Sequence, residues 1–217
     1  MLRLLLDYDG TLHHCLKIYA PAFRLAYRSL VDRGYRPERT WQAGELVRWL
    51  GLTPSAMWEA FAPDLPRAVR EGCAKQIEGE MLRLTAAGEA RLYPGVPEAL
   101  EKLRGMGCSL ILLSNCQRAY LEAHARAFQL GRYFDGLYCT EDYGWSPKGE
   151  LFSVIQRDFP GKYAAVGDRA SDRELARRNG LPFVGCRYGY GAPEELEGAE
   201  ILISRPEELP EAAAKLI

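Results

Sequence analysis

The sequence places two carboxylates, Asp7 and Asp9, directly after an apolar run that ends at Leu6. An apolar run without alternation is typical of a strand buried on both faces, as in a parallel sheet covered by helices. One aspartate could attack phosphorus as a nucleophile, and the other could protonate the leaving oxygen and later deprotonate water. Gly10 permits a tight turn and Thr11 adds a hydroxyl. The same residue types also form ordinary turns, so this stretch alone leaves both interpretations open.

Three further stretches combine polar side chains with predicted strand ends or loops. Ser114 and Asn115 follow the apolar run LILL, Lys148 lies in SPKGELF, and Asp168 and Asp172 lie in VGDRASD. Together with DYDGT, these stretches resemble the four motifs of the haloacid dehalogenase-like hydrolases, in the same order. The segments YPGVPEAL and GLPFVGCRYGYGAPEEL also resemble the phosphoglycolate phosphatase-like branch of that family.

The resemblance implies a role for each of these residues. Asp7 would be the nucleophile and Asp9 the general acid and base. The phosphoryl group would be bound by Gly10, Thr11, Ser114, Asn115 and Lys148. The Asp7 and Asp168 side chains, the Asp9 backbone carbonyl and Asp172 would hold Mg²⁺, a hard ion that prefers oxygen ligands. Alternatively, Asp168 and Asp172 could cap the following helix, and Lys148 could be a solvated lysine at a helix start.

The protonation states of the aspartate pair follow from simple expectations. The free pKa of an aspartate is ~3.9, which predicts that Asp7 is ionised at neutral pH. Asp9 must carry a proton to act as an acid, so we expect neighbouring carboxylates to raise its pKa. Residues two apart on a strand point the same way, although a turn that begins at Asp9 would separate the two side chains.

The pattern of apolar residues predicts an α/β fold with an insertion. Strands are expected at 109–113, 136–139, 163–166, 182–185 and 201–203, with helices between them. This alternation is typical of a doubly wound parallel sheet. Residues 14–90 show only helical patterns, at 21–32, 41–50, 55–61 and 64–87. We therefore expect a Rossmann-like core of residues 1–13 and 91–217 and a helical cap of residues 14–90. The resemblance implies that this cap closes over the active site.

Composition argues against several classes of partner. The formal net charge of −1 gives no reason to expect nucleic acid or an anionic membrane as a partner. No apolar stretch is long enough to span a bilayer, and the start of the chain does not read as a signal peptide, so we expect a cytoplasmic location. The six cysteines form no CxxC pair, which favours reduced thiols that fill the core. Cys116, close to Ser114, is expected to be such a thiol.

Two other groups of residues have structural interpretations. His13 and His14 lack a cluster of partner ligands, so we expect them to face solvent or the hinge, although His13 could contact a leaving group. The tryptophans Trp41, Trp49 and Trp58 fall at helical spacing and are expected in the core of the cap.

The function predicted from these residues is a Mg²⁺-dependent phosphatase acting on a small phosphate ester. A phosphomutase of the β-phosphoglucomutase type is the enzymatic alternative, because it shares all four motifs. A non-catalytic interaction protein on the same scaffold is a weaker alternative, since such proteins usually lose one of the aspartates that are present here.

Overall fold

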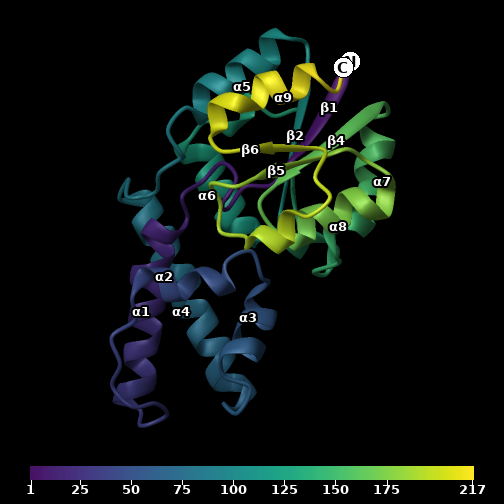
Figure 1. The fold of residues 1–217 in the computed structure, drawn as a ribbon. Helices are drawn as coiled ribbons and strands as arrows, with labels where there is room; N and C mark the ends of the chain where they lie inside the picture. Colours follow the sequence, from purple (N-terminus) through teal and green to yellow (C-terminus); the bar gives the residue numbers. More distant parts are fainter. The chain divides into compact units, whose positions relative to one another are not determined.

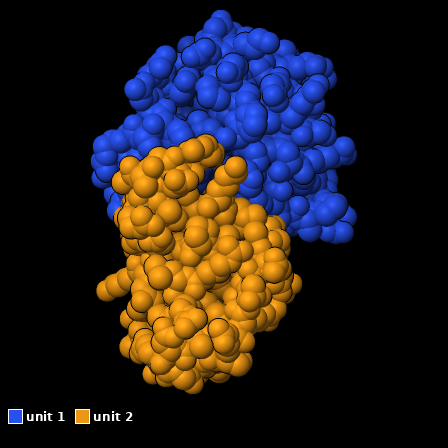
Figure 2. All heavy atoms as spheres, turned by 90° about the vertical axis from the view of Figure 1, so that its left-hand side faces the viewer, with its two compact units in different colours: residues 1–14, 92–217 blue, residues 15–91 orange.

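The structure is a computed structural model that describes residues 1–217 and divides them into two compact units. One unit consists of residues 1–14 and 92–217, and the other of residues 15–91, as coloured in Figure 2. The predicted boundaries, 1–13 with 91–217 and 14–90, lie one residue away from these. None of the helices is both long enough and apolar enough to cross a membrane.

The first unit contains a six-stranded parallel sheet, which confirms the predicted doubly wound α/β fold. Its strands run in the order β3-β2-β1-β4-β5-β6, and every neighbouring pair is parallel (Figure 1). Their bounds are β1 Leu2–Leu6, β2 Ser109–Ser114, β3 Gly136–Cys139, β4 Lys162–Gly167, β5 Phe183–Cys186 and β6 Ile201–Ile203. The apolar run before Asp7 therefore forms a central strand, between β2 and β4.

Helices cover both faces of this sheet. They are α5 Val96–Gly105, α6 Arg118–Ala127, α7 Lys148–Asp158, α8 Ala170–Asn179 and α9 Leu209–Ala214. Leu5 of β1 and Ile111 of β2 are buried in one cluster with side chains of α7 and α8, such as Phe152 and Leu175. Successive strand residues point to opposite faces, so the equally buried Leu4 and Leu6 face away from α7 and α8. α5 packs against α9 on this second face (Figure 1).

The second unit is helical throughout. It consists of α1 Leu16–Asp32, α2 Ala43–Leu46, the 3₁₀ helix η1 Val47–Trp49, α3 Pro54–Phe61 and α4 Arg67–Ala86, and α1 packs along α4. The three tryptophans are buried as predicted, and Trp41 and Trp49 join Phe23 and Phe61 in a cluster of aromatic rings with centroids 5.0–5.7 Å apart. The Thr53 hydroxyl accepts a hydrogen bond from the Ala56 N–H and caps α3.

Two helix predictions in this unit differ from the structure. The first helix begins at Leu16 and not at Pro21, because a proline within a helix removes only one backbone hydrogen bond and neighbouring packing can offset that loss. The segment 41–50 forms a one-turn helix followed by a 3₁₀ turn instead of one helix. Gln42 is the N-cap of the short helix, and its N–H donates to the Glu45 carboxylate at 2.8 Å.

Candidate active site

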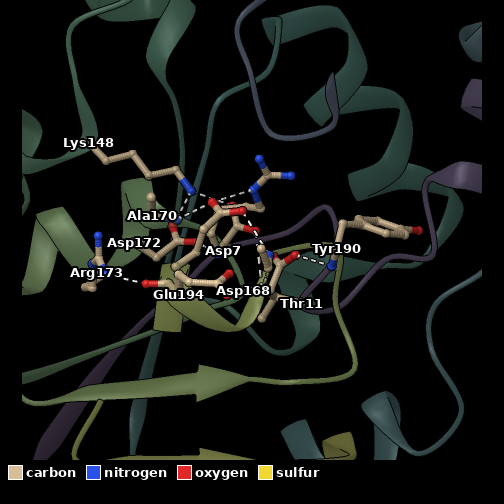
Figure 3. Close-up of polar contacts among 12 residues, drawn as sticks. Asp7, Thr11, Lys148, Asp168, Ala170, Asp172, Arg173, Tyr190 and Glu194 are labelled. Atoms are coloured by element: carbon tan, nitrogen blue, oxygen red, sulfur yellow. Dashed lines mark hydrogen bonds and ion pairs between the residues drawn. The ribbon is translucent and has the colours of Figure 1, made fainter. Parts of the chain in front are cut away.

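Asp7 is the buried centre of the candidate site. It follows β1 directly, and its N–H donates to the Val166 carbonyl at 2.9 Å, so the pairing with β4 continues beyond the strand. Residues 5 and 7 point to the same face of the sheet, the one covered by α7 and α8. Lys148, the first residue of α7, places its Nζ 2.5 Å from Asp7 Oδ1 and 2.7 Å from Asp172 Oδ1 (Figure 3). This buried lysine is therefore part of the site and is not a solvated helix-start residue.

Asp168 and Asp172 come from the end of β4 and the first turn of α8. Asp168 is fully buried, and its carboxylate accepts hydrogen bonds from the Thr11 hydroxyl at 3.1 Å and the Tyr190 N–H at 2.7 Å (Figure 3). Asp172 divides its two oxygens between two tasks. Its Oδ2 accepts from the Arg169 N–H at 3.1 Å, which caps α8, while its Oδ1 faces Lys148. Asp172 therefore caps α8 and contacts Lys148 at the same time, so the two interpretations of this residue are compatible.

These three aspartates form a group that could hold a metal ion. Their nearest carboxylate oxygens all lie within 4.8 Å of one another. With three carboxylates ionised and Lys148 protonated, the formal charge of the group is −3 + 1 = −2, which a divalent cation would neutralise. All the donors are hard oxygen atoms, which suits Mg²⁺ or Ca²⁺ better than a softer metal.

Burial and mutual repulsion raise the pKa values of these carboxyl groups. Burial raises the pKa of Asp7 well above its usual value; Asp172 and Asp168 raise it further, and Lys148 opposes them. Burial, followed by repulsion from Asp172, raises the pKa of Asp168 to about 7. The free pKa of an aspartate therefore does not describe Asp7, because that value neglects the loss of water around the buried group. A cation bound here would restore the ionised forms.

Glycines bring the backbone close to Asp168. Gly10 has φ +98°, and a Cβ at this position would overlap the Asp168 carboxylate. A Cβ at Gly189 would overlap the same side chain, and one at Gly191 would overlap the Asp168 carbonyl oxygen. Gly189 and Gly191 therefore let the backbone pack closely against Asp168, and this close approach lets the Tyr190 N–H reach the carboxylate.

Asp9 lies outside the group of three aspartates. The turn at Gly10 returns the chain so that the N–H groups of Leu12 and His13 both donate to the Tyr8 carbonyl at 2.8 Å. Asp9 Oδ1 lies 2.8 Å from His13 Nδ1 and accepts a hydrogen bond from the Tyr120 hydroxyl, also at 2.8 Å. The side chains of Asp7 and Asp9 are thus directed to different partners, as expected if a turn begins at Asp9.

The surroundings of Asp9 overturn two expectations. Burial raises the pKa of Asp9, but the hydrogen bond and charge of His13, with smaller contributions from His124 and Tyr120, outweigh it and lower the pKa. The predicted rise assumed that neighbouring carboxylates would dominate, whereas hydrogen-bond donors surround the group. His13 is fully buried and does not face solvent. Its partner Tyr120 is distant in sequence and carries no motif, so no sequence signal indicated it.

The remaining predicted site residues lie at the same edge of the sheet. Leu6 pairs with Leu112 of β2 and with Val166 of β4. Ser114 and Asp168 each follow these partners by two residues, so they lie at the same height at the carboxyl edge of the sheet. Ser114 is buried at the end of β2 and Asn115 follows, partly exposed. The Thr11 hydroxyl is fully buried and donates to Asp7 Oδ2 at 3.3 Å as well as to Asp168, so in this structure it orients carboxylates. Burial raises the pKa of the Cys116 thiol, which favours an inert core residue.

Comparisons with known proteins point to one family. A family model described as haloacid dehalogenase-like hydrolase matches residues 3–180. A phosphoglycolate phosphatase from Synechococcus elongatus is 27% identical over 230 residues, which cover 100% of this chain and 99% of that protein. A 5′-nucleotidase from Pseudomonas aeruginosa is 33% identical over 121 residues, and the match spans 54% of this chain and 55% of the nucleotidase. The solved structure of a predicted phosphatase from Clostridium acetobutylicum has the same fold, with a TM-score of 0.82 at 20% identity over 98% of each chain.

Proposed function

Because this chain belongs to the haloacid dehalogenase-like hydrolases, we propose that it is a Mg²⁺-dependent phosphatase acting on a small phosphorylated metabolite. The observation that carries the proposal is the setting of Asp7. Its buried carboxylate lies 2.5 Å from the Lys148 ammonium, and two further carboxylates have oxygens within 4.8 Å. These distances support the assignment of Asp7 as the nucleophile, of Lys148 as a fixed positive charge beside it, and of the carboxylates as metal ligands.

The reaction we propose has two steps that share Asp7. In the first, a carboxylate oxygen of Asp7 forms a bond to phosphorus while the bond to the leaving oxygen breaks, and Asp9 gives that oxygen a proton. In the second, Asp9 takes a proton from water as the water oxygen attacks phosphorus, and the Asp7–phosphate bond breaks. Inorganic phosphate leaves, and both aspartates return to their starting states.

Positive charge is the main requirement of this site. A phosphate monoester is a dianion, and its uncatalysed hydrolysis needs up to ~10²¹-fold acceleration. The Lys148 ammonium would stabilise charge on the transferring phosphoryl group. Mg²⁺ held by Asp7, Asp168 and Asp172 would supply the rest of the positive charge that the dianion requires. We propose that Ser114, the N–H of Asn115 and the backbone at Gly10 bind the phosphoryl oxygens.

The names of the relatives narrow the substrates to be tested. We propose 2-phosphoglycolate first and nucleoside 5′-monophosphates second, because the full-length relative is a phosphoglycolate phosphatase and the nucleotidase match spans about half of each chain. The test is phosphate release from a panel of these esters and sugar phosphates, with Mg²⁺ and with chelator, beside Asp7→Asn and a matched Asp135→Asn control. Asp135 pairs with Arg104 on the surface, outside the site.

The outcomes of this experiment separate the alternatives. Mg²⁺-dependent release that is lost in Asp7→Asn and retained in Asp135→Asn supports the proposal, and the ranking of esters identifies the substrate class. Release that survives Asp7→Asn refutes the role of Asp7 as the nucleophile. Conversion of a hexose 1-phosphate to the 6-phosphate without free phosphate would identify a phosphomutase instead.

A further inference from the structure

Asp9 is held at one of its two carboxylate oxygens. Both of its side-chain hydrogen bonds, with His13 Nδ1 and with the Tyr120 hydroxyl, are made at Oδ1, at 2.8 Å each. The side chain remains 19% exposed, whereas the His13 side chain is fully buried. No protein group hydrogen-bonds to Oδ2. The carboxylate is therefore fixed through one oxygen and open at the other.

The direction of these hydrogen bonds follows from the chemistry of the groups. An ionised carboxylate only accepts, so Nδ1 of His13 carries the proton that it shares with Asp9. The Tyr120 hydroxyl also donates to Oδ1 and lies 3.1 Å from the same Nδ1. Two donors that meet at one oxygen restrict rotation of the carboxylate more than a single hydrogen bond would.

Buried rings hold the two donors in place. His13 stacks on Tyr8, with centroids 5.3 Å apart and planes 13° apart, and packs edge to face with His124, with centroids 4.6 Å apart. The Tyr8 hydroxyl and His124 Nδ1 are hydrogen-bonded at 2.9 Å. Tyr8, His13, Tyr120 and His124 are all at least nine-tenths buried. Because purely apolar rings would fill the same space without buried polar atoms, a site that needs only packing does not require this arrangement.

We propose that His13 and Tyr120 are positioning residues that hold Asp9 by Oδ1, so that Oδ2 is the oxygen that exchanges protons. This inference rests on the proposed phosphatase function. In the first step the proton on Oδ2 passes to the leaving oxygen as the phosphorus–oxygen bond breaks, and in the second step a water proton returns to Oδ2. The protons balance over one turnover, and His13 and Tyr120 keep theirs throughout.

Esters with different leaving groups distinguish residues that position Asp9 from residues that only stabilise the fold. An alkyl phosphate needs a proton from Asp9 as it leaves, whereas 4-nitrophenyl phosphate has a stable leaving anion and needs little help. The value of kcat/KM covers the steps up to release of this group. We expect Tyr120→Phe to lower kcat/KM about 10-fold for the best alkyl ester, and His13→Leu about 100-fold, because each removes a hydrogen bond to a charged group. For 4-nitrophenyl phosphate we expect losses of at most about 3-fold.

Control variants make the comparison specific. Asp9→Asn should show the same dependence on the leaving group with a larger loss. His13→Asn keeps an N–H donor close to the Nδ1 position, so it should recover most of the activity that His13→Leu loses. Tyr163→Phe is the matched tyrosine control, since its buried hydroxyl donates to backbone carbonyls of Ile155 and Phe159 and does not reach the site. Equal losses for both esters in the His13 and Tyr120 variants would overturn the proposal.

A crystal structure of His13→Leu tests the same idea without turnover. We expect the Asp9 carboxylate to leave its present orientation or to occupy more than one, and an unchanged carboxylate would overturn the proposal. This measurement also separates the two hypotheses. If the wild-type protein released no phosphate from any ester, the proposed function would fail, while the orientation of Asp9 in the variant would still decide the positioning role.

Discussion

The substitution Asp168→Asn should stabilise the protein in the presence of chelator, although it removes a predicted metal ligand. Folding raises the pKa of Asp168 from 3.8 to about 7, so above pH 7 the folded state must ionise a group that it disfavours. This rise corresponds to about 4 kcal/mol, at 1.36 kcal/mol for each tenfold change in the ionisation constant. Asparagine is neutral and avoids this cost.

The substitution Asp168→Asn also removes one of the two hydrogen bonds that the Asp168 carboxylate accepts. Asp168 accepts from the Thr11 hydroxyl and the Tyr190 N–H, and an asparagine oxygen can replace only one of these acceptors. The lost bond costs about 1–2 kcal/mol. We therefore expect Asp168→Asn to raise the free energy of unfolding by about 2 kcal/mol at pH 8 in chelator, as the difference between these two contributions.

The pH dependence gives the sign of the effect. A carboxyl group with a raised folded-state pKa contributes stability that is present below its unfolded pKa near 4 and is lost as the pH rises through about 7. At pH 5 the wild type is destabilised by about 1.6 kcal/mol, because Asp168 is ionised in the unfolded chain and must take up a proton on folding. The hydrogen bond that the variant loses costs about as much, so the two proteins should be equally stable at this pH. The advantage of the variant should thus grow from near zero at pH 5 to its full value at pH 8.

Urea unfolding followed by circular dichroism measures this difference. The samples are wild type, Asp168→Asn and an Asp32→Asn control at the exposed end of α1, at pH 5 and pH 8 with chelator and at pH 8 with Mg²⁺. We expect the control to change stability by at most about 0.5 kcal/mol. With Mg²⁺ the order of wild type and variant should reverse, because binding stabilises the intact site more. A variant that is less stable than wild type at pH 8 in chelator, or a difference that does not change with pH, would refute the reasoning.

Four other predictions concern the site and the buried cysteines. Lys148→Met should lower phosphate release by about 10²–10³-fold and destabilise the protein by about 3 kcal/mol, because it leaves Asp7 and Asp172 buried without their cation; activity within 10-fold of wild type would contradict this. Gly191→Ala should destabilise by more than about 2 kcal/mol in thermal unfolding, since its Cβ would overlap the Asp168 carbonyl oxygen; an unchanged melting temperature would show that the backbone can move. Chelator should abolish phosphate release and Mg²⁺ should restore it, and full activity after dialysis against chelator would exclude a metal requirement. All six cysteines are buried, so a thiol reagent such as DTNB should label none of them until the protein is unfolded, and rapid labelling of one would identify an opening segment.

The sequence predicted the sheet and the group around Asp7 because both depend on local signals. Apolar runs such as LILL in β2 mark strands that are buried on both faces, and in parallel sheets the residues that follow the strands meet at one edge. The resemblance to the four motifs then assigned Asp7, Lys148, Asp168 and Asp172 to one site. In the structure these residues are in direct contact or lie a few ångströms from one another.

The surroundings of Asp9 and the protonation states could not be predicted in this way. The direction of the Asp9 side chain depends on the turn at Gly10 and on Tyr120, which lies 111 positions away and becomes a neighbour only in the folded chain. A pKa depends on how much water each carboxyl loses and on which donors surround it, and the sequence shows neither. The pKa of Asp9 was therefore expected to shift in the wrong direction, and the expectation for Asp7 omitted the rise that burial causes.

The central position of β1 has a consequence for synthesis of the chain. β1 is made first, but its partners β2 and β4 begin at Ser109 and Lys162, so the strand that carries Asp7 has to wait for most of the chain. The helices of residues 15–91 contact one another over shorter sequence distances, which favours their earlier folding on the ribosome. The metal-binding carboxylates can meet only after Asp172 has emerged. A nascent chain that stalls before β2 has emerged therefore exposes the apolar strand LRLLL without either of its neighbours, and this is the interval in which a chaperone would be needed most.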